Sequence, residues 1–301
     1  MSKIAAQHSF HHEITYTSID HHTLARYDWP VPTGSAKALV LLVHGLGEHM
    51  GRYQHVAFAL QQAGYRVIGY DHVGHGLSSG KRGDTDTPDQ LTEHLQHMAK
   101  EVKSLHTGLP LVLLGHSMGG LVVQRAAASD RSLADAVVMS SPALATFANA
   151  LQKLLLATLP KWLPHLRVDN GLKLEGLSRD AQVVRDYKHD RLVHRLISAS
   201  LGAWIVQEGI KAVQQVEQWQ VPSLLLYAGQ DKLVNPQGSA EFSKRASAEV
   251  LQSHCFNVMY HEIFNDPEKQ VVLQKLVHWL DARFASAHSS CDNTTNGAVS
   301  E

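Results

Sequence analysis

The sequence predicts an α/β fold, in which a mostly parallel sheet is flanked by helices on both faces. Short apolar runs, rich in Val, Ile and Leu and bounded by turn residues, lack polar alternation, which is the pattern of strands buried on both faces. These runs are residues 38–43, 65–70, 110–114, 136–140 and 223–227. Stretches with helical spacing of apolar residues separate them, and strands that alternate with helices indicate a parallel sheet.

The helical stretches carry their own boundary signals. In the first stretch, apolar residues recur every three or four positions from Tyr53 onward, and Gly64 marks the predicted C-terminal end of the helix. The second covers residues 91–105 and follows Thr87-Pro88-Asp89-Gln90, which predicts a capping box with proline at the first helical position. The last predicted helix, residues 272–284, is preceded by Asp266-Pro267, which signals its start.

The remaining segments complete the predicted architecture. Residues 250–257 are a less regular sixth strand candidate, and residues 12–29 predict an antiparallel hairpin at one edge of the sheet. The alternation breaks at residues 142–216, which we expect to form a helical cap over the sheet. The core then comprises residues 1–141 and 217–285, and the Ser/Asn/Thr/Gly-rich tail 286–301 is expected to be disordered.

Composition excludes several classes of protein. The 301 residues carry 27 Lys and Arg against 28 Asp and Glu, which disfavours a nucleic-acid binder. Two cysteines cannot form a disulfide framework or a cysteine-built zinc site, and none of the 21 histidines lies in an HExxH motif, so we expect no metal and no cofactor. The N-terminus lacks the apolar region of a signal peptide, and the apolar stretch 147–166 is interrupted by lysine and proline. We therefore expect a cytoplasmic protein, and peripheral contact with a membrane stays open.

The motif Gly115-His116-Ser117-Met118-Gly119 carries the chemistry. It follows a predicted strand and precedes a predicted helix at residues 121–129, which is the context of a nucleophile elbow. Such a tight turn presents the serine hydroxyl at a helix N-terminus, where unpaired amides and the helix dipole favour negative charge. Ser117 is therefore the predicted nucleophile.

A serine nucleophile needs a base and an acid that orients the base. On this type of fold the chain order is Ser, then Asp or Glu, then His. Asp231 follows the strand 223–227, and His261 follows the strand 250–257, so both occupy carboxyl ends of strands, where such sheets place their sites. His254 and His278 are competitors, but they fall inside a predicted strand and a predicted helix.

The negative charge that develops on the substrate oxygen needs hydrogen-bond donors. One donor should be the backbone amide of Met118, directly after the nucleophile. The second should come from the loop His44-Gly45-Leu46-Gly47, where we expect the amide of Leu46. Both donors are main-chain groups, so side-chain replacement should leave them in place.

With these residues identified, the chain resembles the monoacylglycerol lipase and lysophospholipase group of α/β-hydrolases, also described as serine aminopeptidase-type hydrolases. The matching segments begin at residues 44, 71, 115, 177, 228 and 260, and the combination of HGLGEHMGRY with GHSMGG is specific. The chain departs from the family pattern at 256–260, where the family usually has a glycine before the histidine.

The resemblance implies an α/β-hydrolase fold and hydrolysis of monoacyl lipid esters, monoacylglycerol to glycerol and fatty acid, through an acyl-enzyme on Ser117. It also implies an apolar cap that covers the acyl chain. Residues that match positions near the glycerol end of the site are Glu48, Arg52, His116 and Tyr187. The alternative for Glu48 and Arg52 is that they brace the loop.

Several other functions remain open. A lysophospholipase, or a general carboxylesterase of broader or shorter-chain specificity, would use the same residues. A catalytically inactive binding module on this fold is a second class. The third is a peripheral membrane protein anchored by residues 151–163. Ser117 argues against epoxide hydrolases and dehalogenases, which use aspartate at the elbow, and the acidic groups of an aminopeptidase cannot be placed in the cap.

Overall fold

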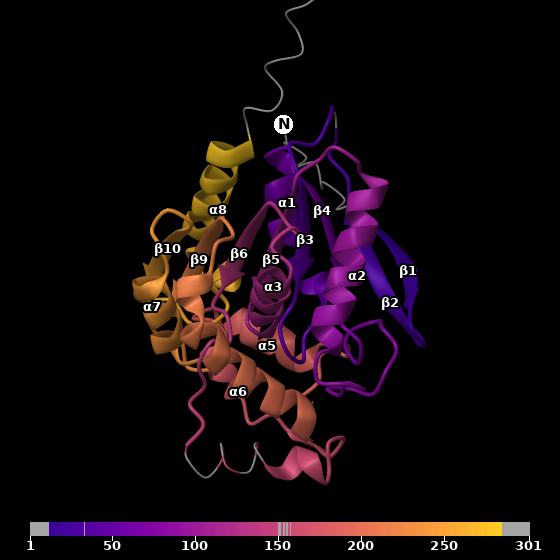
Figure 1. Ribbon diagram of the computed structural model, residues 1–301, viewed down its shortest axis with the longest axis vertical. Coiled ribbons are helices and arrows are strands. Elements are labelled where there is room, and N and C mark those ends of the chain that lie inside the picture. Colours follow the sequence, from indigo (N-terminus) through magenta and orange to yellow (C-terminus); the bar gives the residue numbers. More distant parts are fainter. Residues whose placement is uncertain are drawn as a thin grey trace, which may run out of the picture.

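The centre of the molecule is a twisted eight-stranded sheet, shown in Figure 1. The computed structural model describes residues 12–32, 34–149, 152, 154, 156 and 158–284, so the predicted tail 286–301 lies outside the described residues. In spatial order the strands are β1 (Glu13–Ile19), β2 (His22–Trp29), β4 (Arg66–Tyr70), β3 (Leu39–Val43), β5 (Leu111–His116), β6 (Ala136–Ser140), β9 (Ser223–Ala228) and β10 (Leu251–Phe256).

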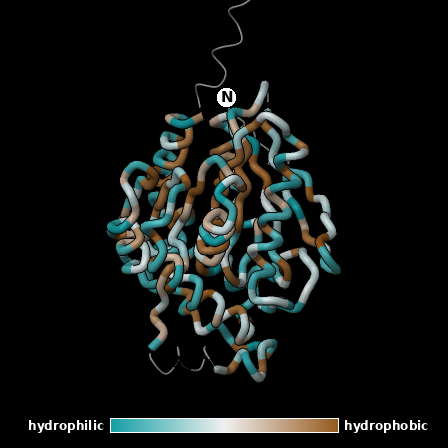
Figure 2. Tube along the Cα trace, in the orientation of Figure 1, coloured by the Kyte–Doolittle hydropathy of each residue, from teal (hydrophilic) through white to brown (hydrophobic). Residues whose placement is uncertain are grey.

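The predicted strands are confirmed, including the irregular sixth candidate, which is β10. From β4 to β10 all neighbours pair in parallel, whereas β1 and β2 form the predicted antiparallel hairpin at one edge. Every residue of β3, β5 and β6 is buried. Figure 2 shows these central strands as the most hydrophobic part of the trace.

Helices cover both faces of the sheet, and each face has its own apolar core. Alternate residues of β3 serve the two cores, with Leu39, Leu41 and Val43 on one side and Val40 and Leu42 on the other. The first side packs against α2 (Gln90–Leu105), α3 (Met118–Ser129), α6 (Ala199–Gln214) and α7 (Pro236–Arg245). The second packs against α1 (Gln54–Gln62) and α8 (Lys269–Phe284).

The segment 142–216 is not purely helical, so that expectation was incomplete. Its short elements are η2 (Leu159–Lys161), β7 (Arg167–Asp169), η3 (Leu174–Gly176), α5 (Ala181–His189) and β8 (Leu196–Ser198), followed by α6. β7 and β8 pair as a small antiparallel sheet. Strands of three residues are too short to show a period of two in the sequence. In Figure 1 most of this segment lies below the sheet.

The predicted start of α2 was also wrong. The helix begins at Gln90, and the side chain of Asp89, its N-cap residue, makes no capping hydrogen bond. The buried Gln90 side chain instead turns back, where its Oε1 accepts a hydrogen bond from the Asp86 amide at 2.9 Å. Gly64 ends α1 with φ of +87°, as predicted. Among the helices of the described chain, none combines the length and apolarity that crossing a membrane requires.

Candidate active site

Ser117 sits in a strained turn between β5 and α3. Its φ of 54° and ψ of −120° lie in a region that non-glycine residues seldom adopt. The turn is too tight for side chains on its flanks, because a Cβ on Gly115 would lie 2.2 Å from the Gly119 carbonyl oxygen. This crowding explains why glycines flank the serine and why the hydroxyl projects beyond the sheet.

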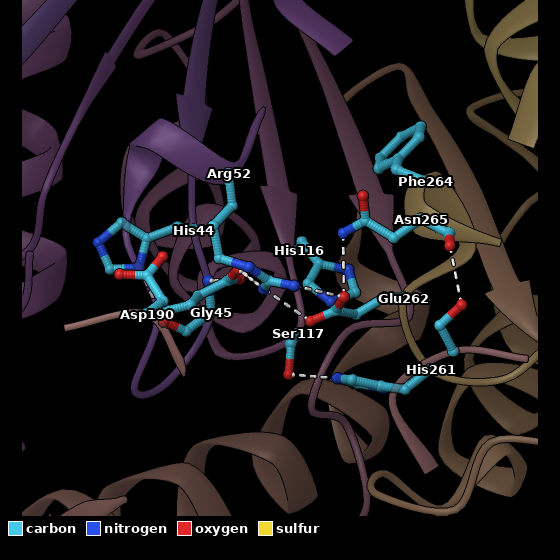
Figure 3. A network of polar contacts seen from close by, with 12 residues as sticks. His44, Gly45, Arg52, His116, Ser117, Asp190, His261, Glu262, Phe264 and Asn265 are labelled. Carbon is cyan, nitrogen blue, oxygen red and sulfur yellow. Dashed lines mark hydrogen bonds and ion pairs between the residues drawn. The ribbon is translucent and has the colours of Figure 1, made fainter. Parts of the chain in front are cut away.

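The structure brings Ser117, His261 and Asp231 together. His261 Nε2 lies 2.8 Å from Ser117 Oγ, a contact drawn in Figure 3, and His261 Nδ1 lies 2.6 Å from Asp231 Oδ2. The second carboxylate oxygen of Asp231 accepts hydrogen bonds from the amides of Leu233 and Val234 at 2.8 and 2.9 Å. A hydroxyl, a base and an orienting acid are therefore in hydrogen-bond contact. The competing His254 and His278 lie within β10 and α8.

The electrostatics around Ser117, His261 and Asp231 suit proton transfer. Burial disfavours the charged imidazolium of His261, but the Asp231 carboxylate outweighs burial and raises the pKa of His261 above its ordinary value. Burial also disfavours the Asp231 carboxylate, yet the charge and hydrogen bond of His261 and the two loop amides keep the pKa of Asp231 below its usual range. Asp231 thus remains ionised and supports the proton that His261 would take.

The loop that carries His261 is hydrogen-bonded to the insertion at residues 142–216. The His261 amide donates to the Gly176 carbonyl at 3.3 Å, and the Glu262 amide donates to the Leu177 carbonyl at 2.8 Å. The missing glycine at 256–260 therefore does not prevent this loop from placing the imidazole beside Ser117.

The amides of Leu46 and Met118 are available as donors. Within the described part of the chain, neither amide donates to a protein acceptor. Met118 is the first residue of α3, where backbone N–H groups have no partner inside the helix. Both residues line the same cavity as Ser117 and His261. Their part in an oxyanion hole stays a prediction.

A large cavity opens directly above Ser117. Its volume is about 760 Å³, within the range of small-molecule sites. The sheet side contributes Leu46, Ser117, Met118 and His261, and the opposite wall comes mainly from the segment 142–216. Apolar residues of that wall include Leu156, Leu159, Leu166, Val168, Ile197, Ile205 and Val206. The chemistry therefore faces a predominantly apolar chamber.

Behind the cavity, Arg52 links the loop after β3 to the loop of His261. Its guanidinium makes a bidentate pair with Glu262, with both N–O distances 2.7 Å, and also donates to Glu48 Oε2 at 2.5 Å. Figure 3 shows Arg52 reaching toward Glu262. Glu48 Oε1 accepts from the Gly45 amide at 2.7 Å and from the Tyr53 hydroxyl at 2.6 Å. These buried contacts join the loops that supply Leu46 and His261.

Charge neutralisation keeps this buried network ionised. Burial opposes the charge of Glu48, but Arg52 lowers the pKa of Glu48 to about 2. Burial likewise opposes the charge of Arg52, and Glu262 and then Glu48 raise its pKa well above the ordinary value. Sequence reasoning missed Glu262. The signal that could have found it is its position directly after His261, where a carboxylate lies beside the predicted site.

The other two predicted substrate contacts lie in the same region. His116 is buried, with Nδ1 3.0 Å from Ser140 Oγ and its ring 4.8 Å from that of His261. Burial, and then the neighbouring His261, lower the pKa of His116 to about 4. The ring of Tyr187 lies 4.7 Å from the Arg52 guanidinium. Glu48, Arg52, His116 and Tyr187 all lie outside the lining of the large cavity, and their contact with substrate stays a prediction.

Comparison with known proteins places this site in a family. Residues 34–268 match the family model described as serine aminopeptidase, S33. The chain belongs to this family. A monoacylglycerol lipase of Mycolicibacterium smegmatis is 33% identical over 84% of this chain and 91% of its own. An uncharacterised abhydrolase domain-containing protein of Dictyostelium discoideum is 32% identical over 89% of this chain, which spans 29% of that protein. The crystal structure of a Paleococcus ferrophilus monoacylglycerol lipase superposes with a TM-score of 0.78 at 34% identity, covering 86% of this chain and 98% of the other.

This S33-family hydrolase therefore has the α/β-hydrolase fold, and the resemblance seen in the sequence is confirmed. The loop at residues 71–80 supports the site from the side, as the carboxylate of Asp71 accepts hydrogen bonds from the amides of Met50 and Leu77, both at 2.7 Å. His44 Nε2 accepts from the His72 amide at 2.9 Å. The loop that carries Leu46 is thus fixed from two directions.

Proposed function

We propose that this hydrolase cleaves the carboxylic esters of monoacyl lipids, releasing fatty acid and glycerol from monoacylglycerol through an acyl-enzyme on Ser117. The observation that carries the proposal is the 2.8 Å contact of Ser117 Oγ with His261 Nε2 at the floor of an apolar cavity of about 760 Å³. The names of the Mycolicibacterium and Paleococcus relatives support the same substrate class.

The reaction follows from the geometry. His261 Nε2 takes the proton of Ser117, and Oγ attacks the ester carbonyl carbon, forming a tetrahedral oxyanion. The amides of Leu46 and Met118 stabilise this oxyanion, and loss of one such donor typically costs about 10²–10³ in rate. His261 then protonates the leaving alcohol, and water hydrolyses the acyl-enzyme by the same steps. Asp231 holds the tautomer of His261 and stabilises the imidazolium.

The cap wall provides selectivity for the acyl chain. Each methylene transferred from water to an apolar wall contributes about 0.8 kcal/mol, which is about fourfold in affinity. An acyl chain that fills the cavity would therefore be favoured over acetate by several powers of ten. We infer that the alcohol of the ester lies on the side of Glu48, Arg52, His116 and Tyr187, which match family positions near the glycerol end and lie outside the cavity lining.

A substrate series tests the proposal. The enzyme is assayed on p-nitrophenyl esters from acetate upward, then on monoacylglycerols and lysophospholipids, with Ser117→Ala as the blank. We expect kcat/KM to rise with chain length and monoacylglycerols to be cleaved. A maximum at acetate without cleavage of monoacylglycerol would indicate a general carboxylesterase, and preference for lysolipids a lysophospholipase. Failure of a fluorophosphonate to label Ser117 would support an inactive binding module.

We also propose that the cap makes transient contact with a membrane surface. Beside the cavity wall, Trp162 and Leu163 are 85% and 52% exposed, and Lys161 precedes them. Apolar side chains next to a basic residue suit the boundary between headgroups and acyl chains. In a flotation assay with vesicles that contain anionic lipid, the wild type should float with the vesicles. A smaller fraction of Trp162→Glu should do so. Equal flotation of both proteins, or none of either, would contradict this contact.

A further inference from the structure

A second cluster of reactive side chains lies outside the active site, where the turn between β1 and β2 meets the loop before α2. The Nε2 atoms of His21 and His22 lie 2.8 and 2.7 Å from the same oxygen of Asp86. The two imidazole rings are 4.2 Å apart between centroids. One ligand atom from each residue lies within 4.8 Å of the other two. Two nitrogens and one carboxylate oxygen therefore converge on one point.

This donor set selects a class of ion. Imidazole nitrogen with carboxylate oxygen suits Zn²⁺, Co²⁺ and Ni²⁺, whereas Mg²⁺ and Ca²⁺ prefer oxygen ligands alone. The ion would bind the lone pair of each Nε2, and the hydrogen of each neutral imidazole would then be on Nδ1.

Neighbouring side chains orient these ligands. The buried His22 has its other ring nitrogen, Nδ1, 3.4 Å from Ser79 Oγ, which leaves Nε2 for the ion. The buried Gln90 accepts from the Asp86 amide at 2.9 Å and points its own amide at Asp86 Oδ2 at 3.4 Å. Metal-binding histidines and carboxylates commonly have such hydrogen-bonded partners, which fix tautomer and direction. His22 and Asp86 therefore each have a hydrogen-bond partner that orients them toward the shared point.

The cluster is open on one side. The side chains of His21 and Asp86 are 73% and 48% exposed, so an ion can enter from solvent and water can complete its coordination. On the protein side, the buried ring of His94 packs edge-on against His22 at 6.1 Å, and its Nε2 lies 3.7 Å from Asp20. His94 and Asp20 therefore add a further imidazole and a further carboxylate next to the cluster, and neither is a lysine or an arginine.

We propose that His21, His22 and Asp86 form a binding site for a divalent transition-metal ion of the zinc class. The ion would join two parts of the chain 64 residues apart, the edge hairpin and the loop that precedes α2. That loop also contacts the cap, because the Ser198 amide donates to the Gly83 carbonyl at 2.7 Å and His165 Nδ1 lies 3.1 Å from Asp84. The ion would therefore act as a structural clamp beneath the cap.

Zinc binding is measured on the full chain. Because its 21 histidines also bind zinc weakly elsewhere, the site is detected as the difference in bound zinc between the wild type and the site variants. Equilibrium dialysis against Zn²⁺ is compared among the wild type, His21→Ala, Asp86→Asn and the control His278→Ala, which removes an exposed histidine from α8. We expect the wild type and His278→Ala to retain one more tightly bound equivalent, and to gain more in Tm with zinc, than the two site variants. Gln90→Ala should weaken binding by about 10–100-fold.

Co²⁺ gives an independent readout, because its visible absorption reports nitrogen and oxygen coordination. The bands that depend on the site should be present in the wild type and in His278→Ala, and lost in His21→Ala and Asp86→Asn. Fluorophosphonate labelling and circular dichroism show that each variant is folded. Equal zinc content, Tm shift and cobalt spectrum in the wild type and the site variants would overturn the proposal and indicate adventitious binding only.

Discussion

The two walls of the active-site cavity are built in different ways. On the sheet side, Ser117 and His261 are backed by buried ions, with Arg52 held between Glu48 and Glu262. The cap side consists mainly of aliphatic side chains, and residues beside it, such as Trp162, are exposed. Buried ion pairs require particular partners and distances, whereas an apolar wall tolerates changes that conserve volume. We therefore expect the chemistry to depend on the first wall, and the choice of acyl chain on the second.

The largest effect should come from the nucleophile. Ser117→Ala should lower kcat by about 10⁶, because the remaining groups cannot form an acyl-enzyme. The measurement is steady-state hydrolysis of a p-nitrophenyl ester, with Tm as a check on folding. Activity within tenfold of the wild type would show that another residue attacks the ester.

Asp231→Asn should lower kcat by about 10⁴ and also change the pH profile. His261 accepts a proton only when neutral, so activity falls as the pH drops through its pKa. That pKa is raised above its ordinary value, so the acid limb of the wild type lies at higher pH than an unperturbed histidine would give. In Asp231→Asn the carboxylate is lost while burial remains, so the pKa of His261 falls and the acid limb moves to lower pH. An unchanged acid limb would contradict the role of Asp231.

Glu262→Gln tests the buried charges directly. It leaves Arg52 with one carboxylate partner in place of two, and breaking a buried pair costs about 3–5 kcal/mol of stability. Denaturant unfolding measures this loss, and kcat/KM should fall for short and long esters equally, because the damage is on the catalytic wall. Glu268→Gln is the matched control, since Glu268 is exposed and pairs with Arg179. If the two variants unfolded alike, the buried network would not hold these loops together.

A change in the cap should have the smallest and most selective effect. Gly202 lines the cavity from α6, and a Cβ there would lie 3.2 Å from the Leu156 side chain. Gly202→Leu should therefore shorten the acyl space and lower kcat/KM on long-chain esters by about fourfold for each methylene excluded. Acetate esters serve as the internal control and should be cleaved as by the wild type. Equal losses on acetate and on long chains would show that the walls are not independent.

The sequence allowed the strands and the converging Ser117, Asp231 and His261 to be predicted, because local signals determine them. Apolar runs without alternation mark the strands, and the elbow motif fixes one point of the site. Once the strands are placed, the loops after β9 and β10 must meet near that point. The start of α2 was misplaced because Gln90 turns toward Asp86, a contact of the folded loop that Pro88 does not reveal.

Other features depend on contacts between distant segments. The pairing of β7 with β8 and the partnership of Arg52 with Glu262 join residues whose neighbourhood no short motif encodes. The same holds for His21, His22 and Asp86, which belong to no HExxH motif and meet only in the folded chain. Motif searches find ligands that share one helix, whereas this cluster draws on a turn and a separate loop.

The two hydrogen bonds from the backbone of His261 and Glu262 to Gly176 and Leu177 limit how the lipid preference of this enzyme can be redesigned. A chimera whose exchanged insertion lacked carbonyl groups at these two places would lose the support of the His261 loop, and we expect it to lose turnover with every ester. An exchange that stopped before Leu174 would keep that support and replace the first part of the cavity wall, from Ala143 to Lys173, while Ile197, Ile205 and Val206 stayed in place. The boundary for such grafting is therefore set by two carbonyl groups, inside the insertion rather than at its ends.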